Sequence, residues 1–298
     1  MEEKFRLGII GFGEVGFAMA VGLKERIGQI AIYDVLLNKD PENKLLKERI
    51  KKAQVNPYIK LELFIKDIDV IFSVNSAGVA ISVAEDIADF IEKRHLFVDL
   101  NSTSPDVQER IQEILEDSGC KLVDAAIMGS IAAHGYQTPI IASGNGRVLF
   151  RDLFKPYGMH INPDLVQKFG QASALKMYRS IFAKGIGTLL IETLVAAYKY
   201  EVGDKVFDLI CSWMDNYQEF ATLAKEIVKN HAIHAGRQAI EMDNVCQTVR
   251  QVDIEPIMSE ATMERLKKTA ATGIREYFSG KTPDDYMKII EFLELHLH

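Results

Sequence analysis

The chain has 298 residues, of which 48% are hydrophobic and 26% are charged, and it carries a formal net charge of −7. This composition is typical of a globular protein that buries a large core, and it excludes a disordered chain. The acidic balance argues against a nucleic-acid binder, because such a protein needs a basic surface for the phosphate backbone.

The location of the protein is predicted from its cysteines and from the absence of targeting segments. Cys120, Cys211 and Cys246 are widely spaced and form no metal-ligand motif, as expected for reduced thiols. No run of about 18 apolar residues is present, so we expect no membrane-spanning helix. The N-terminus shows no charged leader followed by an apolar segment, so no signal peptide is expected. We therefore expect a cytoplasmic protein.

Short apolar runs alternate with helical patterns in the first half of the chain. Strands are predicted at residues 6–10, 29–34, 69–75, 95–101, 120–128 and 138–144, with helices at 15–25, 79–92 and 105–117. This alternation indicates βαβ units and predicts a parallel, doubly wound sheet of the Rossmann type.

The second half of the chain has a different pattern. From about Ala172 onward strand signals are absent, and helical stripes follow at residues 186–197 and 207–229. We place the boundary near residue 165, which gives an α/β domain over residues 1–165 and an all-helical domain over residues 166–298.

A glycine-rich loop follows the first predicted strand directly and opens the first predicted helix. In "RLGIIGFGEVGFAMAVGL", Gly11, Gly13 and Gly16 form a Gly-x-Gly-x-x-Gly pattern. The glycines allow a tight turn, a close approach by a diphosphate and close packing of the helix on the strand. The helix N-terminus supplies free N–H groups for the phosphates. We expect this loop, with Phe12, Glu14 and Val15, to bind a dinucleotide.

An acidic residue ends the second predicted strand at Asp34. A carboxylate there accepts hydrogen bonds from the ribose hydroxyls and repels the extra phosphate of NADP. The alternative role for Asp34 is that of a turn or helix-cap residue. No arginine follows it, although Lys39 is near enough to leave NADP open, so we expect NAD in preference to NADP. Asn75 and Ser76, after the strand at 69–75, are further candidates for cofactor contact.

Three later stretches share a pattern with a known family: "VDLNSTSP" at residues 98–105, "DAAIMGSIAAHG" at 124–135 and "GQASALKMYRSIFAKG" at 170–185. With the glycine loop, they make the chain resemble the β-hydroxyacid dehydrogenases, which include 3-hydroxyisobutyrate and 6-phosphogluconate dehydrogenases. Residues 231–273 resemble the helical C-terminal domain of a phosphogluconate dehydrogenase-like branch. Family members assemble through the helical domain, so the resemblance implies a homodimer.

The resemblance assigns two substrate-binding segments. Asn101, Ser102 and Thr103 match the loop that holds the substrate carboxylate, although Asn101 stands where the family has Ser and Ser102 where it has Thr. Gly129 and Ser130 match the second segment, in which Ser130 replaces a glycine. The alternative for the first segment is a turn that caps the next helix. These departures leave the identity of the substrate open.

The resemblance also places Lys176 on the family's acid–base lysine, which takes the hydroxyl proton while hydride leaves for the nicotinamide. Ser180, one helical turn later, stands where the family has an asparagine that orients the substrate or the lysine. The alternative is an ordinary solvated helix face, with Met177, Tyr178 and Ile181 on the opposite side. A lysine with an ordinary pKa of about 10.4 needs burial or nearby positive charge to act as a base near neutral pH.

The predicted function is therefore NAD(P)-dependent hydride transfer between nicotinamide and a small carboxylate of the β-hydroxyacid type. No metal, nucleic acid or membrane is expected to take part. One alternative is an imine or ketone reductase on the same scaffold, against which the presence of Lys176 argues. The other is a dinucleotide-binding regulatory protein without catalysis, which gains support from the substitutions at Asn101, Ser130 and Ser180.

Overall fold

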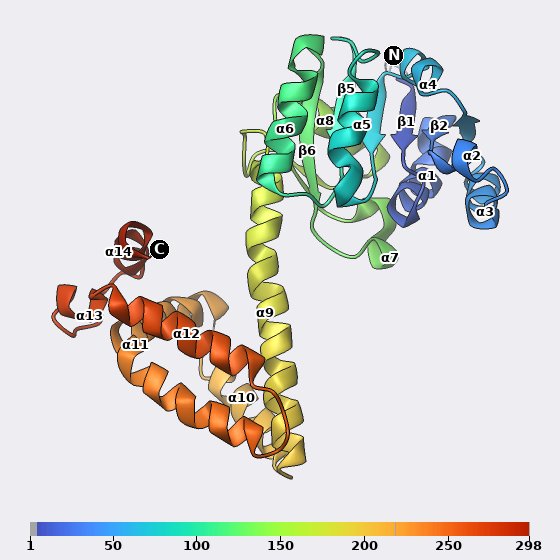
Figure 1. Cartoon of the computed structure of the whole chain (residues 1–298). Helices are drawn as coiled ribbons and strands as arrows, with labels where there is room; N and C mark the ends of the chain where they lie inside the picture. Colours follow the sequence, from blue (N-terminus) through green and yellow to red (C-terminus); the bar gives the residue numbers. More distant parts are fainter. Residues whose placement is uncertain (1–4, 218, 298) are drawn as a thin grey trace. The chain divides into compact units, whose positions relative to one another are not determined.

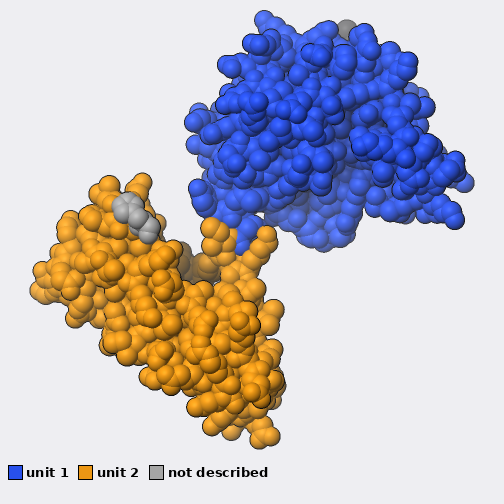
Figure 2. All heavy atoms as spheres, viewed as in Figure 1, with its two compact units in different colours: residues 1–180 blue, residues 181–298 orange. Residues whose placement is uncertain are grey.

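A computed structural model describes residues 5–217 and 219–297 of the chain. The chain forms two compact units, residues 1–180 and residues 181–298 (Figure 2). The division lies inside one long helix, α9 (Gln171–Lys199), which contributes residues to both units.

The first unit contains an eight-stranded sheet with the order β3-β2-β1-β4-β5-β6-β7-β8. Figure 1 labels β1, β2, β5 and β6 of this sheet. The strands are β1 (Leu7–Ile10), β2 (Ile30–Tyr33), β3 (Asn56–Tyr58), β4 (Val70–Ser73), β5 (Leu96–Asp99), β6 (Lys121–Ile127), β7 (Ile140–Ser143) and β8 (Ile161–Asn162). All neighbours run parallel except β6 and β7. The prediction of a Rossmann-type domain followed by an all-helical region is confirmed.

Two features of the sheet differ from the prediction. The pair β6–β7 is antiparallel, because residues 128–139 connect the strands directly without a long crossover helix. The strands β3 and β8 were not predicted, since β3 contains Pro57 at the sheet edge and β8 has only two residues. The predicted parallel sheet therefore contains one antiparallel pair, β6–β7.

Helices cover both faces of the sheet, and each face has its own core. One core contains Leu7 and Ile9 of β1 together with side chains from α1 (Glu14–Ile27), α3 (Lys44–Ala53) and α8 (Arg147–Phe154). The other contains Ile10 with side chains from α4 (Leu61–Asp67), α5 (Ala80–Ile87) and α6 (Pro105–Leu115). Successive residues of a strand point to opposite faces, so a strand buried on both sides is apolar throughout.

Short helices occur in the connections of this unit. They are α2 (Leu36–Lys39) and α7 (Ile131–His134), and the 3₁₀ turns η1 (Ala77–Val79), η2 (Glu116–Ser118), η3 (Gly135–Gln137) and η4 (Lys155–Tyr157).

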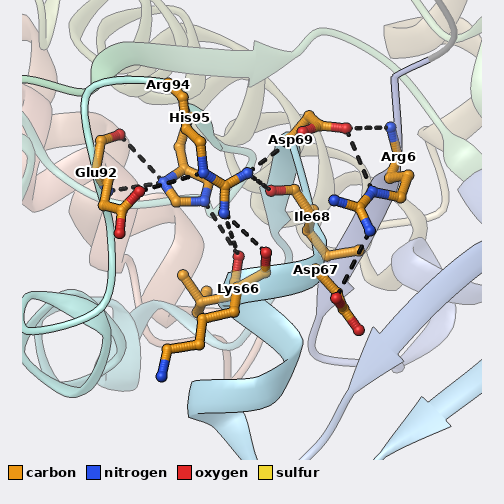
Figure 3. Close-up of polar contacts among 9 residues, drawn as sticks. Arg6, Lys66, Asp67, Ile68, Asp69, Glu92, Arg94 and His95 are labelled. Carbon is orange, nitrogen blue, oxygen red and sulfur yellow. Dashed lines mark hydrogen bonds and ion pairs between the residues drawn. The ribbon is translucent and has the colours of Figure 1, made fainter.

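The amino end of the sheet carries a polar network around the C-terminus of α4 (Figure 3). The guanidinium of Arg94 donates to the carbonyls of Lys66 and Ile68, each at 2.8 Å. The buried ring of His95 lies 3.1 Å from the carbonyl of Ile65. The carbonyls of Ile65 and Lys66 belong to the last turn of α4, and Ile68 is the residue that follows the helix. The Ile65 carbonyl also accepts the Ile68 N–H at 3.3 Å. The network also includes Arg6, Asp67, Asp69 and Glu92. It is a structural cap at the end of the sheet opposite to the glycine loop.

The second unit is helical. After α9 it contains α10 (Gly203–Asp215), α11 (Phe220–Arg250), α12 (Ile257–Ala271), α13 (Ile274–Tyr277) and α14 (Met287–His296). The predicted single stripe at residues 207–229 is wrong, because α10 ends at Asp215 and α11 begins at Phe220. Small cores lie between α11 and its neighbours, one around Ile233, Ile289 and Phe292 and one around Ala239 and Leu266.

The helix α9 is long and apolar enough to cross a membrane, judged by length and composition alone, although we expected no such segment. It is the one helix of this kind in residues 5–217 and 219–297. A single helix of this kind is weak evidence for a membrane span, because the core helix of a soluble protein can have the same length and apolar composition. Only 6% of the most apolar 18-residue stretch of α9 is buried within the chain.

Candidate functional site

A cavity of about 550 Å³ lies at the carboxyl ends of β1, β2 and β4, where the strand order reverses. Ligands of open parallel sheets bind at this kind of position. Eight of the predicted cofactor residues line the cavity: Gly11, Phe12, Gly13, Glu14, Val15, Asp34, Asn75 and Ser76. Phe12 is only 1% exposed, and its side chain belongs to the core. Gly16, the ninth, is buried and does not line the cavity.

The three glycines of the loop are needed for different reasons. Gly11 has a φ of +89°, and a Cβ atom there would lie 2.4 Å from the carbonyl oxygen of Val74. A Cβ atom on Gly16 would lie 2.4 Å from the carbonyl oxygen of Gly11. A Cβ atom on Gly13 would meet nothing within 4 Å. The fold therefore requires glycine at the first and third positions. At the second position glycine serves as the N-cap of α1, and the open space around it also allows a ligand to approach the backbone closely.

The N-terminus of α1 is open toward this cavity. Gly13 is the N-cap residue, and no side chain caps the helix. The N–H groups of the first turn have no partners within the helix, so they can donate to phosphate oxygens. The loop and the helix together form an anion-binding surface made of backbone.

Asp34 both stabilises the loop and faces the cavity. Its Oδ2 accepts the Phe12 N–H at 2.8 Å and its Oδ1 accepts the Leu36 N–H at 2.9 Å. The contact with Leu36, the first residue of α2, is the turn role that the sequence left open. Each carboxylate oxygen has a second lone pair that remains able to accept a ribose hydroxyl. Lys39 lines the same cavity and provides a positive charge there.

A buried polar cluster connects the cofactor end of the cavity with the first predicted substrate loop. The N–H of Asn75 donates to Oδ1 of Asn101. The amide nitrogen of Asn101 donates to Oδ1 of Asp99 and, at 3.1 Å, to Oγ of Ser73. Asn101 is 3% exposed, so its side chain holds the loop together. Thr103 is equally buried and accepts the amide of Gln108 at 2.7 Å.

The exposed candidates for substrate contact lie at the ends of β5 and β6. Ser102 is the exposed member of its loop, between the two buried residues Asn101 and Thr103. Gly129 and Ser130 are exposed after β6. The Oγ of Ser130 accepts the Ala133 N–H at 3.3 Å and so caps the short helix α7. The side chains that are open to a ligand are therefore serines.

The first turns of α9 belong to the first unit and carry the two predicted catalytic residues. Ser173 is 2% exposed and is bonded to Asp124 of β6, so the start of α9 is attached to the sheet. Lys176 follows one helical turn later and is partly buried. Ser180 donates its hydroxyl to the Lys176 carbonyl at 2.8 Å, which leaves its oxygen lone pairs to act as acceptors.

The apolar side of this helix differs from an ordinary buried face. Tyr178 is 69% exposed and Ile181 is 72% exposed. The apolar residues of this helix are therefore not all buried within the single chain, as they would be in an ordinary helix with one solvated face and one buried face.

Two buried aspartates, Asp99 and Asp124, were not among the predicted site residues. Asp99 lies near the end of the strand predicted at 95–101, and Asp124 lies in the middle of the strand predicted at 120–128. An acidic residue inside an apolar run was the available signal. Burial raises the pKa of Asp99 to about 7, although donors from Gln108 and Asn101 act in the opposite direction. Burial also raises the pKa of Asp124, against the hydrogen bonds from Ser173.

Comparisons with known proteins identify the family. Residues 6–161, more than half of the chain, match the NAD binding domain of 6-phosphogluconate dehydrogenase. The chain belongs to this family. Residues 197–269 match a domain of unknown function, DUF1932, which is the helical C-terminal domain found in this family.

Individual relatives extend this similarity. A conserved protein of unknown function, whose structure is described as similar to 3-hydroxyacid dehydrogenases, is 29% identical with a TM-score of 0.61, covering 93% of this chain and 99% of that one. The mitochondrial 3-hydroxyisobutyrate dehydrogenase of Drosophila melanogaster is 24% identical over 42% of this chain and 37% of its own length. A reductive aminase from Aspergillus terreus in complex with NADPH4 shares the fold, with 12% identity and a TM-score of 0.71, over 97% of this chain and 99% of that one.

The family and the fold support assignment of the protein to the NAD(P)-dependent oxidoreductases. The cavity at the switch point, the open N-terminus of α1 and the glycine loop are consistent with this assignment.

Proposed function

We propose that the protein is an NAD(P)-dependent dehydrogenase that acts on a small carboxylate of the β-hydroxyacid type. The observation that carries the proposal is the attachment of α9 to β6 through Ser173 and Asp124, one turn before Lys176. Lys176 thereby belongs to the same compact unit as the dinucleotide cavity and the loop at residues 101–103. Similarity to 3-hydroxyacid dehydrogenases gives further support for the substrate class.

The chemistry assigned to the chain is proton transfer. The bound nicotinamide supplies the hydride acceptor for the carbon that carries the substrate hydroxyl. The neutral amine of Lys176 accepts the hydroxyl proton as the C–H electron pair leaves, and the carbon–oxygen bond becomes a carbonyl. The hydroxyls of Ser102 and Ser130 are the proposed donors to the substrate carboxylate, and Ser180 the proposed acceptor near Lys176.

For the cofactor we propose a preference for NAD over NADP. The half-buried carboxylate of Asp34 lies in the cavity wall and is already held by two backbone N–H groups. A fixed negative charge at this position repels a 2′-phosphate and accepts ribose hydroxyls. Lys39 in the same wall opposes this effect, so the preference depends on which of the two is nearer to the ribose.

The test measures nicotinamide absorbance with NAD and NADP against a panel of 3-hydroxyacids, for the wild type, Lys176→Met and Lys184→Met. Lys184 is an exposed lysine on the same helix and serves as the control. Loss of a general base lowers kcat by about 10²- to 10⁴-fold, so we expect this loss only in Lys176→Met. Equal rates in the two variants would refute the role of Lys176. Reduction of imines that survives in Lys176→Met would support the reductase alternative instead.

Cofactor binding without turnover on any hydroxyacid or imine would favour the regulatory alternative. A fluorescence titration with NADH and NADPH, without an added dye, measures this binding directly. It therefore separates a failed substrate class from a failed dinucleotide site.

We further propose that the protein is a cytoplasmic homodimer in which a second copy covers apolar side chains of the helical unit. Phe182 and Ile191 of α9 are 55% and 65% exposed, and Leu209 of α10 is 70% exposed. Exposed apolar surface of this extent marks an interaction surface, and the family resemblance implies a second copy. We expect a mass about twice 33.5 kDa by light scattering, from protein in the soluble fraction, and a lower mass for Ile191→Asp. A wild-type monomer at micromolar concentration would refute the dimer.

A further inference from the structure

The cavity at the carboxyl ends of β1, β2 and β4 extends past the glycine loop and Asp34 as far as α5. This part of the lining comes from the end of β2, the starts of α2 and α4, the turn η1 and the helix α5. We call it the α5 pocket, and its residues are Tyr33, Leu36, Leu61, Val79, Ser82, Val83 and Asp86. The site described so far gives these residues no role.

Most of the α5 pocket is apolar. Tyr33, Leu61 and Val83 are partly buried and pack against the second core of the sheet, so the fold holds them in place. Leu36 and Val79 line the same pocket and are 37% and 42% exposed. Ligand sites are commonly lined by apolar side chains, with a few polar groups that fix the orientation of the ligand. The α5 pocket therefore suits a ligand group with apolar faces.

Asp86 is the charged residue of the α5 pocket. Within residues 5–217 and 219–297 its carboxylate accepts no hydrogen bond and forms no ion pair. Burial raises the pKa of Tyr33, and the charge of Asp86 raises it further, so the carboxylate lies near the Tyr33 hydroxyl. The polar end of the pocket thus offers a carboxylate whose oxygens remain able to accept hydrogen bonds.

The neighbouring residue Glu85 shows that this position is specific. Glu85 is also acidic, exposed and part of α5, but it does not line the cavity. An acidic residue on an exposed helix face is usually hydrated and serves solubility. Asp86 differs from Glu85 because its side chain borders a cavity with apolar walls.

The position of the α5 pocket identifies the part of the dinucleotide that enters it. The diphosphate is expected at the N-terminus of α1, beside Gly13, and the ribose beside Asp34. Tyr33 directly precedes Asp34, and the N–H of Leu36 donates to its carboxylate at 2.9 Å. The pocket therefore adjoins the ribose on the side away from the diphosphate. The group attached to the ribose there is the adenine base.

The chemistry of the base explains a carboxylate at this place. A negative charge repels phosphates, and Asp34 is already available for the ribose hydroxyls. The adenine edge carries an exocyclic amino group with two N–H donors, whereas hypoxanthine and guanine have a carbonyl oxygen at the same position. Carboxylates accept hydrogen bonds from exocyclic amino groups of bases and repel a carbonyl oxygen. Adenine is therefore the base that Asp86 favours.

We propose that Asp86 is a specificity-determining residue that selects an adenine dinucleotide by accepting an N–H of the exocyclic amino group, while apolar side chains of the α5 pocket cover the faces of the base. This inference rests on the cofactor site of the proposed function. It is independent of hydride transfer, of the substrate and of the choice between NAD and NADP.

The experiment compares NADH with reduced nicotinamide hypoxanthine dinucleotide, in which a carbonyl oxygen replaces the amino group of the base. Nicotinamide fluorescence gives a Kd for each, with the wild type, Asp86→Asn and the control Glu85→Gln. We expect the wild type to bind NADH about tenfold more tightly than the hypoxanthine analogue. In Asp86→Asn the ratio of the two Kd values should fall to about one, because an amide can turn its oxygen to an amino group or its nitrogen to a carbonyl.

The ratio of the two Kd values also removes a general effect of charge. Loss of one negative charge changes the affinity for both dinucleotides alike, because both carry the same diphosphate. Glu85→Gln should therefore keep the wild-type ratio. Asp86 is exposed and has no hydrogen bond to lose in the described chain, so we expect Asp86→Asn to fold, and urea unfolding checks this.

Three outcomes would overturn the inference. They are a wild-type ratio near one, an unchanged ratio in Asp86→Asn, and an equal fall of the ratio in Glu85→Gln. The first of these needs no variant, so the test does not depend on the folding of Asp86→Asn. Absence of NADH binding would refute the cofactor site and this inference together. Binding with the expected ratios but without turnover would refute only the proposed reaction.

Discussion

The second and third glycines of the loop can be distinguished by a single methyl group at each position. Gly13→Ala places a Cβ atom in open space, and the backbone there does not have a positive φ. The only folding cost is a poorer N-cap, which is within about 1 kcal/mol. If the diphosphate passes this amide, the methyl group obstructs it and weakens NADH binding by about 10- to 100-fold, or roughly 1–3 kcal/mol.

Gly16→Ala has the opposite profile. Its Cβ atom would lie 2.4 Å from the Gly11 carbonyl oxygen and 3.3 Å from a methyl group of Ile9, so the loop and the helix must separate. Overpacking costs about 1–3 kcal/mol, and the gain in helix propensity of up to about 1 kcal/mol offsets part of this. We expect a net loss of about 1–2 kcal/mol and a fall in Tm of roughly 3–8 °C. NADH binding should also weaken, because Gly11 is displaced.

Two measurements on the same samples check this prediction: urea unfolding without cofactor and a fluorescence titration with NADH. Gly13→Ala should fold like the wild type and bind poorly, whereas Gly16→Ala should be impaired in both. Wild-type affinity in a folded Gly13→Ala protein would show that the diphosphate does not approach this amide. Wild-type stability in Gly16→Ala would contradict the close contact between α1 and the loop.

Three further predictions concern stability. The pKa of Asp99 is raised from 3.8 to about 7, so the folded state binds more protons than the unfolded state between these pH values. The free energy of unfolding should therefore fall by on the order of 4 kcal/mol as the pH rises from about 4 to 7. Urea unfolding across this range should lose that slope in Asp99→Asn. Burial and the charge of Arg94 lower the pKa of His95, so protonation of this ring favours the unfolded state. The free energy of unfolding should therefore fall as the pH drops below about 6.5, and His95→Gln should reduce this fall in the same titration. An unchanged fall in His95→Gln would refute the assignment of this pH dependence to His95. Glu192 accepts two backbone N–H groups and a hydroxyl at the start of α12. Glu192→Ala should therefore lower the free energy of unfolding by about 1–3 kcal/mol, whereas Glu241→Ala, in an exposed ion pair, should lower it by less than about 0.5 kcal/mol. Equal effects of the two substitutions in thermal unfolding would contradict the capping role of Glu192.

Much of the first unit could be predicted because its signals are local. The apolar runs of β1, β2, β4, β5, β6 and β7 are each apolar enough to be recognised without knowing their neighbours, and the glycine loop lies between adjacent elements. The strands that were missed depend on their surroundings. β3 contains Pro57 and is tolerated only because it lies at the edge, and β8 exists only because β7 is beside it.

The helical unit was harder to predict at its internal boundaries. The apolar stripe of α10 continues in sequence toward α11, but α10 ends at Asp215 and α11 starts at Phe220. A hydrophobic period shows that a segment favours a helix, and it does not show where the chain must turn so that α11 can pack against α12. The exposure of α9 was likewise not visible in its pattern, because an apolar side chain looks the same whether its own chain or another covers it.

By itself, the sequence determined the Rossmann-type class of the first domain, the glycine loop and the helical nature of the remainder, because these follow from short-range periodicity and from the steric needs of single residues. The separate reasons for Gly11, Gly13 and Gly16 and the pairing of Asp99 with Asp124 were decided by the tertiary structure alone. Those two aspartates are far apart in the chain and become neighbours only when β5 and β6 align in register. Their protonation depends on burial, and burial is a property of the assembled sheet and helices rather than of any segment.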